Sequence, residues 1–342
     1  MQHMLGRALI PAIAVALALT GPASAADYFA GKTIELVVGS DVGGGYDIYT
    51  RTIARHIARH IPGNPTILVK NMPGAGSGRA AAYINAVAPK DGTSIGAVFP
   101  GVVMGPLLDE RAERMFDPTK FTFVGTADSG TRVCATFQNS PTKTFDDALR
   151  QKTRMGSSAL GASTRDYVIF KKKTTGVNFE LVMGYKGSAD ILLAMERGEV
   201  DGICGWDWSS VKSQRDEWVR DGKLNLLVQV GLEPDAELTK RNVPPLWNFI
   251  KSDDDRKAIE LIVSQQQFQR PYIAPPGVPA EQAATLRAAF EATMRDPQFL
   301  DDAAKTRIDI NALSGTKVQE LVEKIYATPK AVVERAKELL KP

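Results

Sequence analysis

The chain has 342 residues, of which 44% are hydrophobic and 24% are charged, and its formal net charge is +3. These proportions are ordinary for a globular protein, and the small positive charge argues against a nucleic acid as a partner. The length is sufficient for two domains.

The N-terminus has the features of a secretory signal peptide. Arg7 supplies a positive charge, Ala8–Leu19 is an apolar run, and Ala23-Ser24-Ala25 fits a cleavage site made of small residues. The apolar run has about a dozen residues, whereas a membrane-spanning helix needs about 20. We therefore predict that residues 1–25 are removed on export and that the mature chain is a soluble periplasmic protein.

The mature chain begins with two strand–turn–helix units. Ile34–Val38 is a β-branched run, and Thr66–Val69 is a second short strand. Each strand is followed by a glycine-rich turn, at Asp41–Asp47 and Pro73–Gly78, from which a helix starts. Consecutive units of this kind place free backbone N–H groups at the same edge of a parallel sheet. The sequence therefore predicts an anion-binding site at that edge.

Strands and helices continue to alternate after these units. Further strands are expected at Ser94–Phe99, Val133–Phe137, Arg154–Gly156, Phe179–Met183, Gly202–Trp206 and Leu224–Val230. Helices are expected at Phe145–Leu149, Gly161–Thr175, Ala189–Arg197, Asp254–Gln265, Ala280–Met294 and Thr316–Ile325. This alternation favours α/β domains whose parallel sheets bind ligands at the carboxyl ends of the strands. We expect a first domain at residues 26–126 and 232–342 and a second at residues 127–231.

The two cysteines, Cys134 and Cys204, both lie in strand-like segments. In an oxidising compartment an even pair can form a disulfide. Cysteine is also a common small core residue, so two buried free thiols are an equal alternative. The spacing of the two residues in the sequence does not decide between these alternatives.

Several motifs resemble those of one family of receptors. The run Gly43-Gly44-Gly45-Tyr46-Asp47 followed by Arg51 is similar to the signature Gly-Gly-x-x-Asp…Arg, and Val69–Gly76 closely resembles the motif Val-x-Asn-x-Pro-Gly-Ala-Gly. Further landmarks match, in the family's order, at Ala88–Thr93, Tyr185–Gly187 and Arg197–Asp201. Over nearly the whole mature sequence, the chain resembles the Bug-type periplasmic solute receptors of tripartite tricarboxylate transporters.

The resemblance implies a two-domain Venus-flytrap fold like that of type II periplasmic binding proteins, in which each domain is a mainly parallel sheet flanked by helices. It also implies a receptor that closes on a small organic carboxylate, delivers it to membrane permease subunits and has no catalytic activity. We expect neither a cofactor nor a bound metal, and a monomeric protein.

The candidate ligand-binding residues lie mostly at helix entrances. In the first domain they are Gly43, Gly44, Gly45, Tyr46, Asp47, Gly74, Ala75, Gly76 and Ser77. In the second domain they are Ser157, Ser158, Ser163, Thr164, Trp206 and Asp207. Backbone N–H groups and hydroxyls at helix N-termini suit a carboxylate, and closure about a hinge would bring both sets to it. For any one hydroxyl, the alternative is ordinary capping of its own helix.

Two candidates carry open alternatives. A carboxylate beside an anion site repels the anion, so we expect Asp47 to point into the N-terminus of its own helix, with a role in binding a cationic ligand group as the alternative. Trp206-Asp207-Trp208 departs from the family pattern. Either the indoles cover a bulky apolar or aromatic ligand and Asp207 meets a hydroxyl or amine, or one indole is core and the other packs between the domains.

Other functions are weaker interpretations of the sequence. His56 and His60 have the i, i+4 spacing of zinc ligands, but no third ligand is evident. The triplet Gly43-Gly44-Gly45 lacks the G-x-G-x-x-G order expected of a nucleotide-dependent enzyme. A periplasmic sensor component, which presents its ligand to a signalling protein, would share the same pocket, so the sequence does not separate it from a transport receptor.

Overall fold

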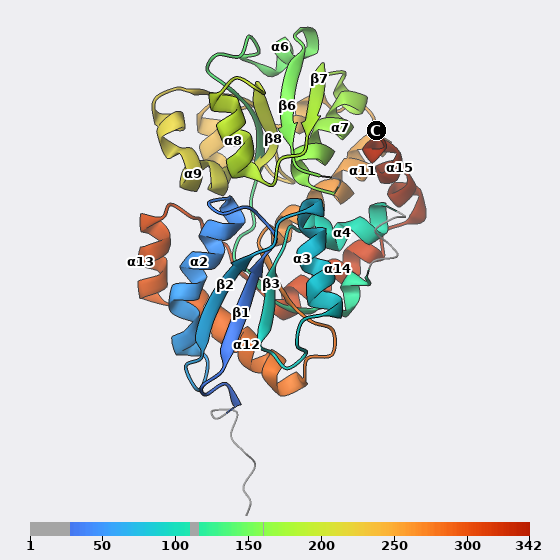
Figure 1. Cartoon of the computed structure of the whole chain (residues 1–342). Helices are drawn as coiled ribbons and strands as arrows, with labels where there is room; N and C mark the ends of the chain where they lie inside the picture. Colours follow the sequence, from blue (N-terminus) through green and yellow to red (C-terminus); the bar gives the residue numbers. More distant parts are fainter. Residues whose placement is uncertain (1–27, 110–115, 160) are drawn as a thin grey trace, which may run out of the picture.

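The computed structural model describes residues 28–109, 116–159 and 161–342, and these residues form two lobes (Figure 1). The predicted signal peptide, residues 1–25, lies outside the described residues. Each lobe is built around one β-sheet, and we call the lobes first and second in the order in which the chain enters them. Within the described residues, no helix is long and apolar enough to cross a membrane.

The sheet of the first lobe has the strand order β11-β4-β10-β3-β1-β2. Its strands are β1 (Thr33–Val38), β2 (Thr66–Asn71), β3 (Ser94–Ala97), β4 (Thr122–Thr126), β10 (Pro271–Ala274) and β11 (Leu313–Ser314). Strand β1 pairs in parallel with both β2 and β3. Strand β10 is antiparallel to β3 and to β4, so β4 runs in the same direction as β1 to β3.

The sheet of the second lobe has the order β7-β6-β8-β5-β9. Its strands are β5 (Arg132–Phe137), β6 (Thr153–Ser157), β7 (Phe179–Met183), β8 (Gly202–Asp207) and β9 (Leu224–Val230). Strand β6 is parallel to β7 and β8, whereas β5 is antiparallel to its neighbours β8 and β9. Strand β5 is the first strand formed after the chain enters the second lobe, and β10 is the first formed after it returns to the first lobe. Each is antiparallel to most strands of its sheet.

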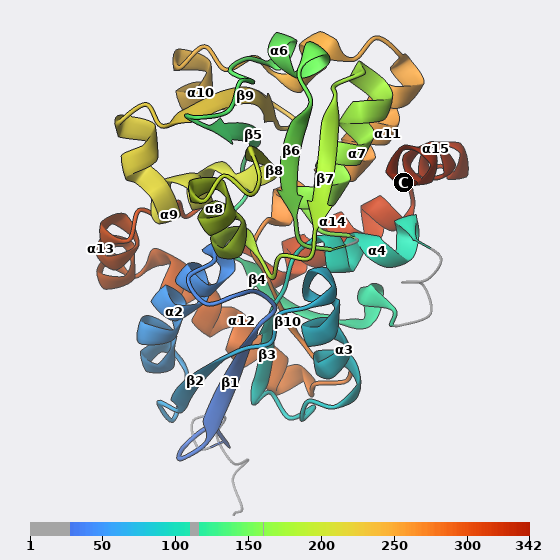
Figure 2. The ribbon, with the colours of Figure 1, turned by 45° about the horizontal axis from the view of Figure 1, so that its top comes forward.

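Helices pack on both sheets, as Figures 1 and 2 show. Up to residue 200 they are α2 (Gly45–Ile57), α3 (Gly78–Ala86), α4 (Gly101–Leu108), α6 (Phe145–Arg150), α7 (Ser163–Thr175) and α8 (Ser188–Glu196). After residue 200 they are α9 (Trp208–Arg220), α10 (Ala236–Lys240), α11 (Asp253–Val263), α12 (Ala280–Arg295), α13 (Pro297–Lys305), α14 (Gly315–Tyr326) and α15 (Lys330–Leu340). The predicted architecture of two α/β domains with flanking helices is confirmed.

Hydrophobic periodicity explains how helices such as α2 pack. Tyr49, Ile53 and Ile57 recur every four residues, so they share one face of α2, and all three are buried in the core of the first lobe. This face fixes the rotation of α2 about its axis. The N-terminus of α2 lies at the boundary between the lobes, because the helix begins at Gly45, shortly after the carboxyl end of β1.

The chain rejoins the first sheet later than residue 232, where we expected the first domain to resume. Leu238 on α10 and Val243 are buried in the same core as Trp208 of the second lobe. A backbone bridge also joins Gln229 of β9 to Pro245. The chain returns to the first sheet only at β10, because these apolar side chains have their partners in the second lobe.

Cys134 and Cys204 form a disulfide in the second lobe. They lie opposite each other on the antiparallel strands β5 and β8, with their Cα atoms 3.9 Å apart, and both are fully buried. The structure therefore takes the disulfide alternative that the sequence left open. The bridge links the strand that enters the second lobe to the strand that precedes α9.

Candidate ligand-binding cavity

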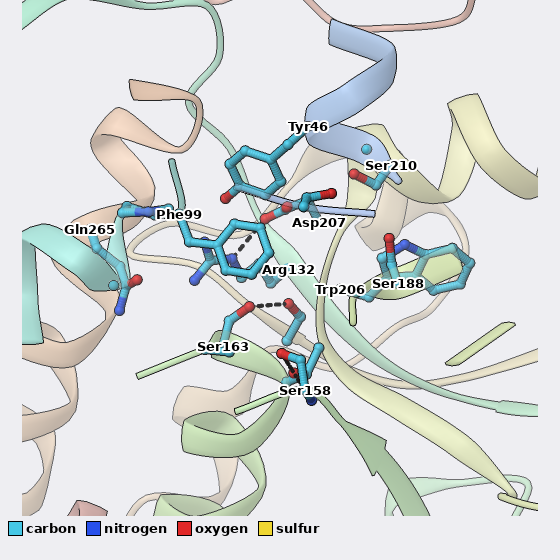
Figure 3. Close-up of a pocket in the computed structure, with 18 residues that line it drawn as sticks. Tyr46, Phe99, Arg132, Ser158, Ser163, Ser188, Trp206, Asp207, Ser210 and Gln265 are labelled. Atoms are coloured by element: carbon cyan, nitrogen blue, oxygen red, sulfur yellow. Dashed lines mark hydrogen bonds and ion pairs between the residues drawn. The ribbon is translucent and has the colours of Figure 1, made fainter. Parts of the chain in front are cut away.

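A buried cavity lies between the two sheets, at the ends of strands from both lobes (Figure 3). Its volume is about 40 Å³. A single water molecule needs at least roughly 10–15 Å³ of such space, so the cavity holds about three waters. The lobes are therefore closed tightly against each other, and only a small free volume remains between them.

Five helices present their N-termini to this cavity. Gly45 begins α2 and Gly101 begins α4 in the first lobe, whereas Ser163 begins α7 and Ser188 begins α8 in the second. Asp207 is the N-cap residue of α9. A helix N-terminus carries a partial positive charge and unpaired backbone N–H groups. Their convergence makes the cavity a favourable environment for an anion.

A buried cluster of three charges forms one wall of the cavity. Asp207 accepts hydrogen bonds from Nε of Arg132 at 2.7 Å and from Nη1 of Arg270 at 2.6 Å. Both arginines are 1% exposed. Burial by itself would raise the pKa of Asp207, but the charges of Arg270 and Arg132 outweigh it and hold that pKa below its ordinary value. Two cations and one anion leave the cluster with a formal charge of +1.

Arg132 and Asp207 of this cluster line the cavity, whereas Arg270 does not, and Arg132 is the cation that a ligand in the cavity would meet. Its Nη1 donates to the hydroxyl of Tyr167 at 3.1 Å, in addition to the bond from Nε to Asp207. Among the described residues, its Nη2 has no hydrogen-bond acceptor. A buried guanidinium with an unused donor is well suited to a carboxylate, because it supplies both charge and direction.

Aromatic rings form another part of the lining. The rings of Tyr46 and Phe99 are 4.5 Å apart, and the guanidinium of Arg270 lies 4.4 Å from the Tyr46 ring centre. Burial raises the pKa of Tyr46 to about 12. The indole Nε1 of Trp206 donates to Oε1 of Gln214 at 3.0 Å, which leaves the apolar part of the ring for packing.

Three of the four predicted hydroxyl residues line the cavity: Ser158, Ser163 and Thr164. Oγ1 of Thr164 accepts from the Ser158 N–H at 3.1 Å, and Oγ of Ser163 donates to the Gly205 carbonyl at 2.8 Å. The hydroxyls thus order their own loops while also facing the cavity. Ser157 does not line it, and its buried Oγ has no hydrogen-bond partner in the described part of the chain.

The first glycine-rich turn reaches the cavity only through Gly45 and Tyr46. Gly43, Gly44 and Asp47 are not part of the lining. The Asp47 carboxylate accepts a hydrogen bond at 2.9 Å from the Gly43 N–H, just before its own helix. Arg51 and Asn71 also donate to it, so the expected structural role of Asp47 is the one that the geometry supports.

The second glycine-rich turn, Gly74 to Ser77, does not line the cavity, contrary to our expectation. Oγ of Ser77 donates to the Gly39 carbonyl at 2.8 Å and accepts from the Phe99 N–H at 3.1 Å, so it ties neighbouring loops together. The reason lies in the strand order, because β2, which precedes this turn, is at the edge of its sheet. Strand β3 is nearer the centre, so Gly101 after β3 occupies the place expected for this turn.

The Trp206-Asp207-Trp208 segment divides between the cavity and the core. Trp206 lines the cavity, whereas Trp208 is buried in the second lobe and donates from Nε1 to Glu237 at 2.9 Å. Asp207 also lines the cavity. Both of its carboxylate oxygens bond arginines, so the expectation that it meets a ligand hydroxyl or amine is not supported by the geometry.

Arg132, Arg270, Phe99 and Gly101 belong to the site but were not among the residues predicted from the sequence. A signal was present for Arg132, which is the one charged residue of the mainly apolar strand Arg132–Phe137. Phe99 ends the third predicted strand and Gly101 follows it, at the same sheet edge as the two glycine-rich turns. Arg270 had no comparable signal, because its partner Asp207 lies 63 positions away in the sequence.

His56 and His60, considered above as metal ligands, are each paired with a carboxylate. Nε2 of His56 lies 2.7 Å from Asp302, and Nε2 of His60 lies 2.7 Å from Asp296. Throughout the described ranges, no group of three or more His, Cys, Asp or Glu side chains is placed to hold a metal ion. The first pair joins α2 to α13, and the second joins the 3-10 turn Ala58–His60 after α2 to the N-cap residue of α13.

Comparisons with solved structures show a fold shared over almost the whole chain. The periplasmic binding protein BugD is 19% identical, with a TM-score of 0.70 over 90% of this chain and 97% of that chain. MatC from Rhodopseudomonas palustris with bound malate is 20% identical, with a TM-score of 0.67 over 91% and 99%. An R. palustris protein with adipate is 22% identical, with a TM-score of 0.68 over 89% and 97%.

Sequence comparisons agree with this fold. The UPF0065 protein in the gbd 5' region of Cupriavidus necator is 26% identical over 348 aligned positions, which cover 98% of this chain and 97% of that protein. A model of the tripartite tricarboxylate transporter family receptor matches residues 50–337. Because that match spans most of the sequence, the chain belongs to the tripartite tricarboxylate transporter receptor family, whose members are periplasmic solute-binding proteins.

Proposed function

We propose that this protein binds a small organic carboxylate between its two lobes and delivers it to the membrane permease of a tripartite tricarboxylate-type transporter. The observation that carries the proposal is the convergence of five helix N-termini and the Arg132 guanidinium on one buried cavity. Residues 1–25 would direct the chain to the periplasm, where it would act as a receptor without catalysis.

Within this proposal, Arg132 holds a ligand carboxylate together with the hydroxyls of Ser158 and Thr164 and the backbone N–H groups of Ser163 and Thr164 at the start of α7. Tyr46 and Trp206 cover the apolar part of the ligand. Related proteins have been solved with malate and with adipate, which suggests a dicarboxylate. Because the cavity has a volume of about 40 Å³, the lobes must separate before such an acid can enter.

A thermal-shift screen of residues 26–342 tests the proposal. The ligands are mono-, di- and tricarboxylates, with nucleotides and amines as comparison classes. A ligand at about 100 times its Kd adds about 2.7 kcal/mol to the free energy of unfolding, which raises Tm by several degrees. We expect a saturable rise with one class of carboxylate. A rise with nucleotides or amines alone would contradict the proposal.

Arg132→Gln tests the assigned role of the guanidinium. The substitution removes the charge but keeps a hydrogen-bonding side chain, and we expect calorimetry to show about tenfold to hundredfold weaker binding of the acid found in the screen. The matched control is Arg154→Gln, because Arg154 also pairs with an aspartate, Asp201, in the second lobe but does not line the cavity. Equal losses in the two variants would contradict the role of Arg132.

A further inference from the structure

The two lobes meet at three glycines that have no room for a side chain. If a Cβ atom is placed on each glycine, its nearest neighbour belongs to the opposite lobe. The distances are 2.1 Å from Gly45 to Oγ of Ser210, 1.9 Å from Gly101 to the carbonyl oxygen of Gly161, and 2.1 Å from Gly187 to Oδ1 of Asp41. All three are far below van der Waals contact, so an alanine at any of them cannot coexist with this closed arrangement unchanged.

At Gly45 and Gly101 an alanine would fit within its own lobe, and at Gly187 the three atoms nearest to such a Cβ all belong to Asp41 of the first lobe. Gly45 and Gly101 begin α2 and α4, and Gly187 has a φ of 177°, which is extended backbone that any residue adopts. At Gly45 and Gly101, the second-nearest atom to such a Cβ belongs to the same residue of the opposite lobe as the nearest one. The third-nearest atom belongs to a side chain and lies 3.5 Å or more away. The obstacle to a side chain is therefore the other lobe and not the local fold.

We propose that Gly45, Gly101 and Gly187 are closure residues, which allow the lobes to approach until the cavity is sealed around the ligand. The inference rests on the proposed function, because closure matters only if the ligand is bound between the lobes. All three glycines line the cavity. Their contacts with the opposite lobe therefore set the distance between the two sides of the cavity when the lobes are closed.

Hydrogen bonds beside the glycines depend on the same approach. The Asp190 N–H, in the first turn of α8, donates to Asp41 across the boundary at 3.3 Å, next to Gly187. Nε2 of Gln214 donates to the carbonyl of Gly43 at 3.1 Å. Since both bonds join the lobes, a side chain that holds the lobes apart would break them.

The three sites are expected to differ in severity. Gly101 faces a backbone carbonyl, which cannot rotate away, so Gly101→Ala should obstruct closure most strongly. Gly45 and Gly187 face the side chains of Ser210 and Asp41, which can turn aside in part. Gly78→Ala is the matched control, because Gly78 also begins a helix, has a φ of −58°, and would bring its Cβ no nearer than 3.5 Å to Ala75 of its own lobe.

A zero-length cross-link measures closure with native residues. Nζ of Lys212 on α9 lies 2.7 Å from the Asp309 carboxylate of the first lobe and 3.5 Å from Glu237 of the second lobe. A carbodiimide joins an amine and a carboxylate that are in contact, and peptide mass spectrometry quantifies each product. The Lys212–Asp309 product reports closure, and the Lys212–Glu237 product, formed within one lobe, is the internal reference.

We expect the ratio of the two products to be the same in the wild-type chain and in Gly78→Ala. Overpacking of this kind is expected to lower the ratio about tenfold or more in Gly101→Ala and less in Gly45→Ala. The double variant Gly45→Ala with Ser210→Gly should regain the wild-type ratio, because it moves the side chain from one side of the contact to the other. Circular dichroism should show the same fold in every variant.

The measurement is made without added ligand and repeated with malate and with adipate. Unchanged ratios in all glycine variants would overturn the inference, as would a wild-type chain that never forms the Lys212–Asp309 product. Failure of the proposed function would look different. In that case no carboxylate would stabilise the protein, while the glycine variants would still lower the cross-link ratio.

Discussion

At the scale of single residues, Asp128 lies where the chain first crosses between the lobes. It is 1% exposed, and its Oδ2 accepts hydrogen bonds from Ser209 of the second lobe at 2.9 Å and from Tyr49 of the first at 3.2 Å. Burial raises the pKa of Asp128 to about 6, although the charge of Arg270 and the bond from Ser209 oppose the rise. Asp128 is thus a titrating group that contacts both lobes.

Asp128→Asn should stabilise the protein at neutral pH. In the folded chain the pKa is about 6 and in the unfolded chain it is close to 3.8, so only the folded state holds the proton between these pH values. The free energy of unfolding therefore falls by about 1–3 kcal/mol as the pH rises from about 4 to about 6, and it stays at the lower value above pH 6. Asparagine removes this loss because it stays neutral.

Thermal unfolding of both proteins across this pH range checks the prediction. We expect the Tm of Asp128→Asn to exceed that of the wild-type chain at pH 7.5, and the gap to shrink at pH 4.5. In the variant, the amide oxygen of Asn can accept the hydrogen bonds that Ser209, Tyr49 and Gln269 donate to Oδ2 of Asp128. Its NH2 group then faces Asn311, whose side-chain amide has to flip so that its oxygen accepts. A variant that is less stable by the same amount at every pH would contradict the assignment.

At the scale of secondary-structure elements, helix α15 connects parts of the molecule that lie far apart in the sequence. It packs against α11, against α7 of the second lobe and against α4 of the first lobe. Figure 2 shows its C-terminal end beside α11. The buried face of α15 includes Val333, Ala336 and Leu339, spaced three residues apart as one face of a helix requires.

Leu339→Ala should destabilise the protein by about 2–5 kcal/mol, because it leaves a cavity among three helices. Leu339 is 1% exposed. The matched control is Leu300→Ala on α13, whose side chain is 41% exposed and which should change stability by no more than about 0.5 kcal/mol. Urea unfolding monitored by circular dichroism gives both values. Similar losses at the two sites would contradict the assignment of Leu339 to the packed face of α15.

The two glycine-rich turns show what a sequence pattern within one strand–turn–helix unit cannot predict. The turn at Asp41–Asp47 and the turn at Pro73–Gly78 are both rich in glycine, and both lead into helices. Only the first reaches the cavity, because β1 lies inside its sheet and β2 lies at the edge. Strand order depends on pairing between distant segments, so a pattern within one unit cannot reveal it.

At the scale of the whole molecule, the disulfide closes a long loop within the second lobe. Cys134 and Cys204 are separated by 70 positions. A cross-link over such a loop lowers the entropy of the unfolded chain, and loop-closure theory gives about 4 kcal/mol of stabilisation, of which real proteins often realise less. The strands it joins carry Arg132 and Trp206, both at the cavity.

Replacing both cysteines by alanine should lower the free energy of unfolding by about 2–4 kcal/mol. Denaturant unfolding of the variant and of the wild-type chain measures the difference. Because β5 and β8 remain hydrogen-bonded along their length, we expect the variant to bind the same acid as the wild-type chain. Wild-type stability in the double variant would mean that the bridge does not form in solution.

The sequence by itself determined the α/β class, the order of most strands and helices, the first helix entrance at the cavity and the structural role of Asp47. These follow from short-range patterns, namely hydrophobic periodicity, glycine-rich turns and capping, which act within one strand–turn–helix unit. The tertiary structure alone decided that α4 faces the cavity and α3 does not, and that Asp207 is held by Arg132 and Arg270. Asp207 is 75 positions from Arg132 and 63 positions from Arg270 in the sequence, so only the tertiary fold brings these three side chains into contact.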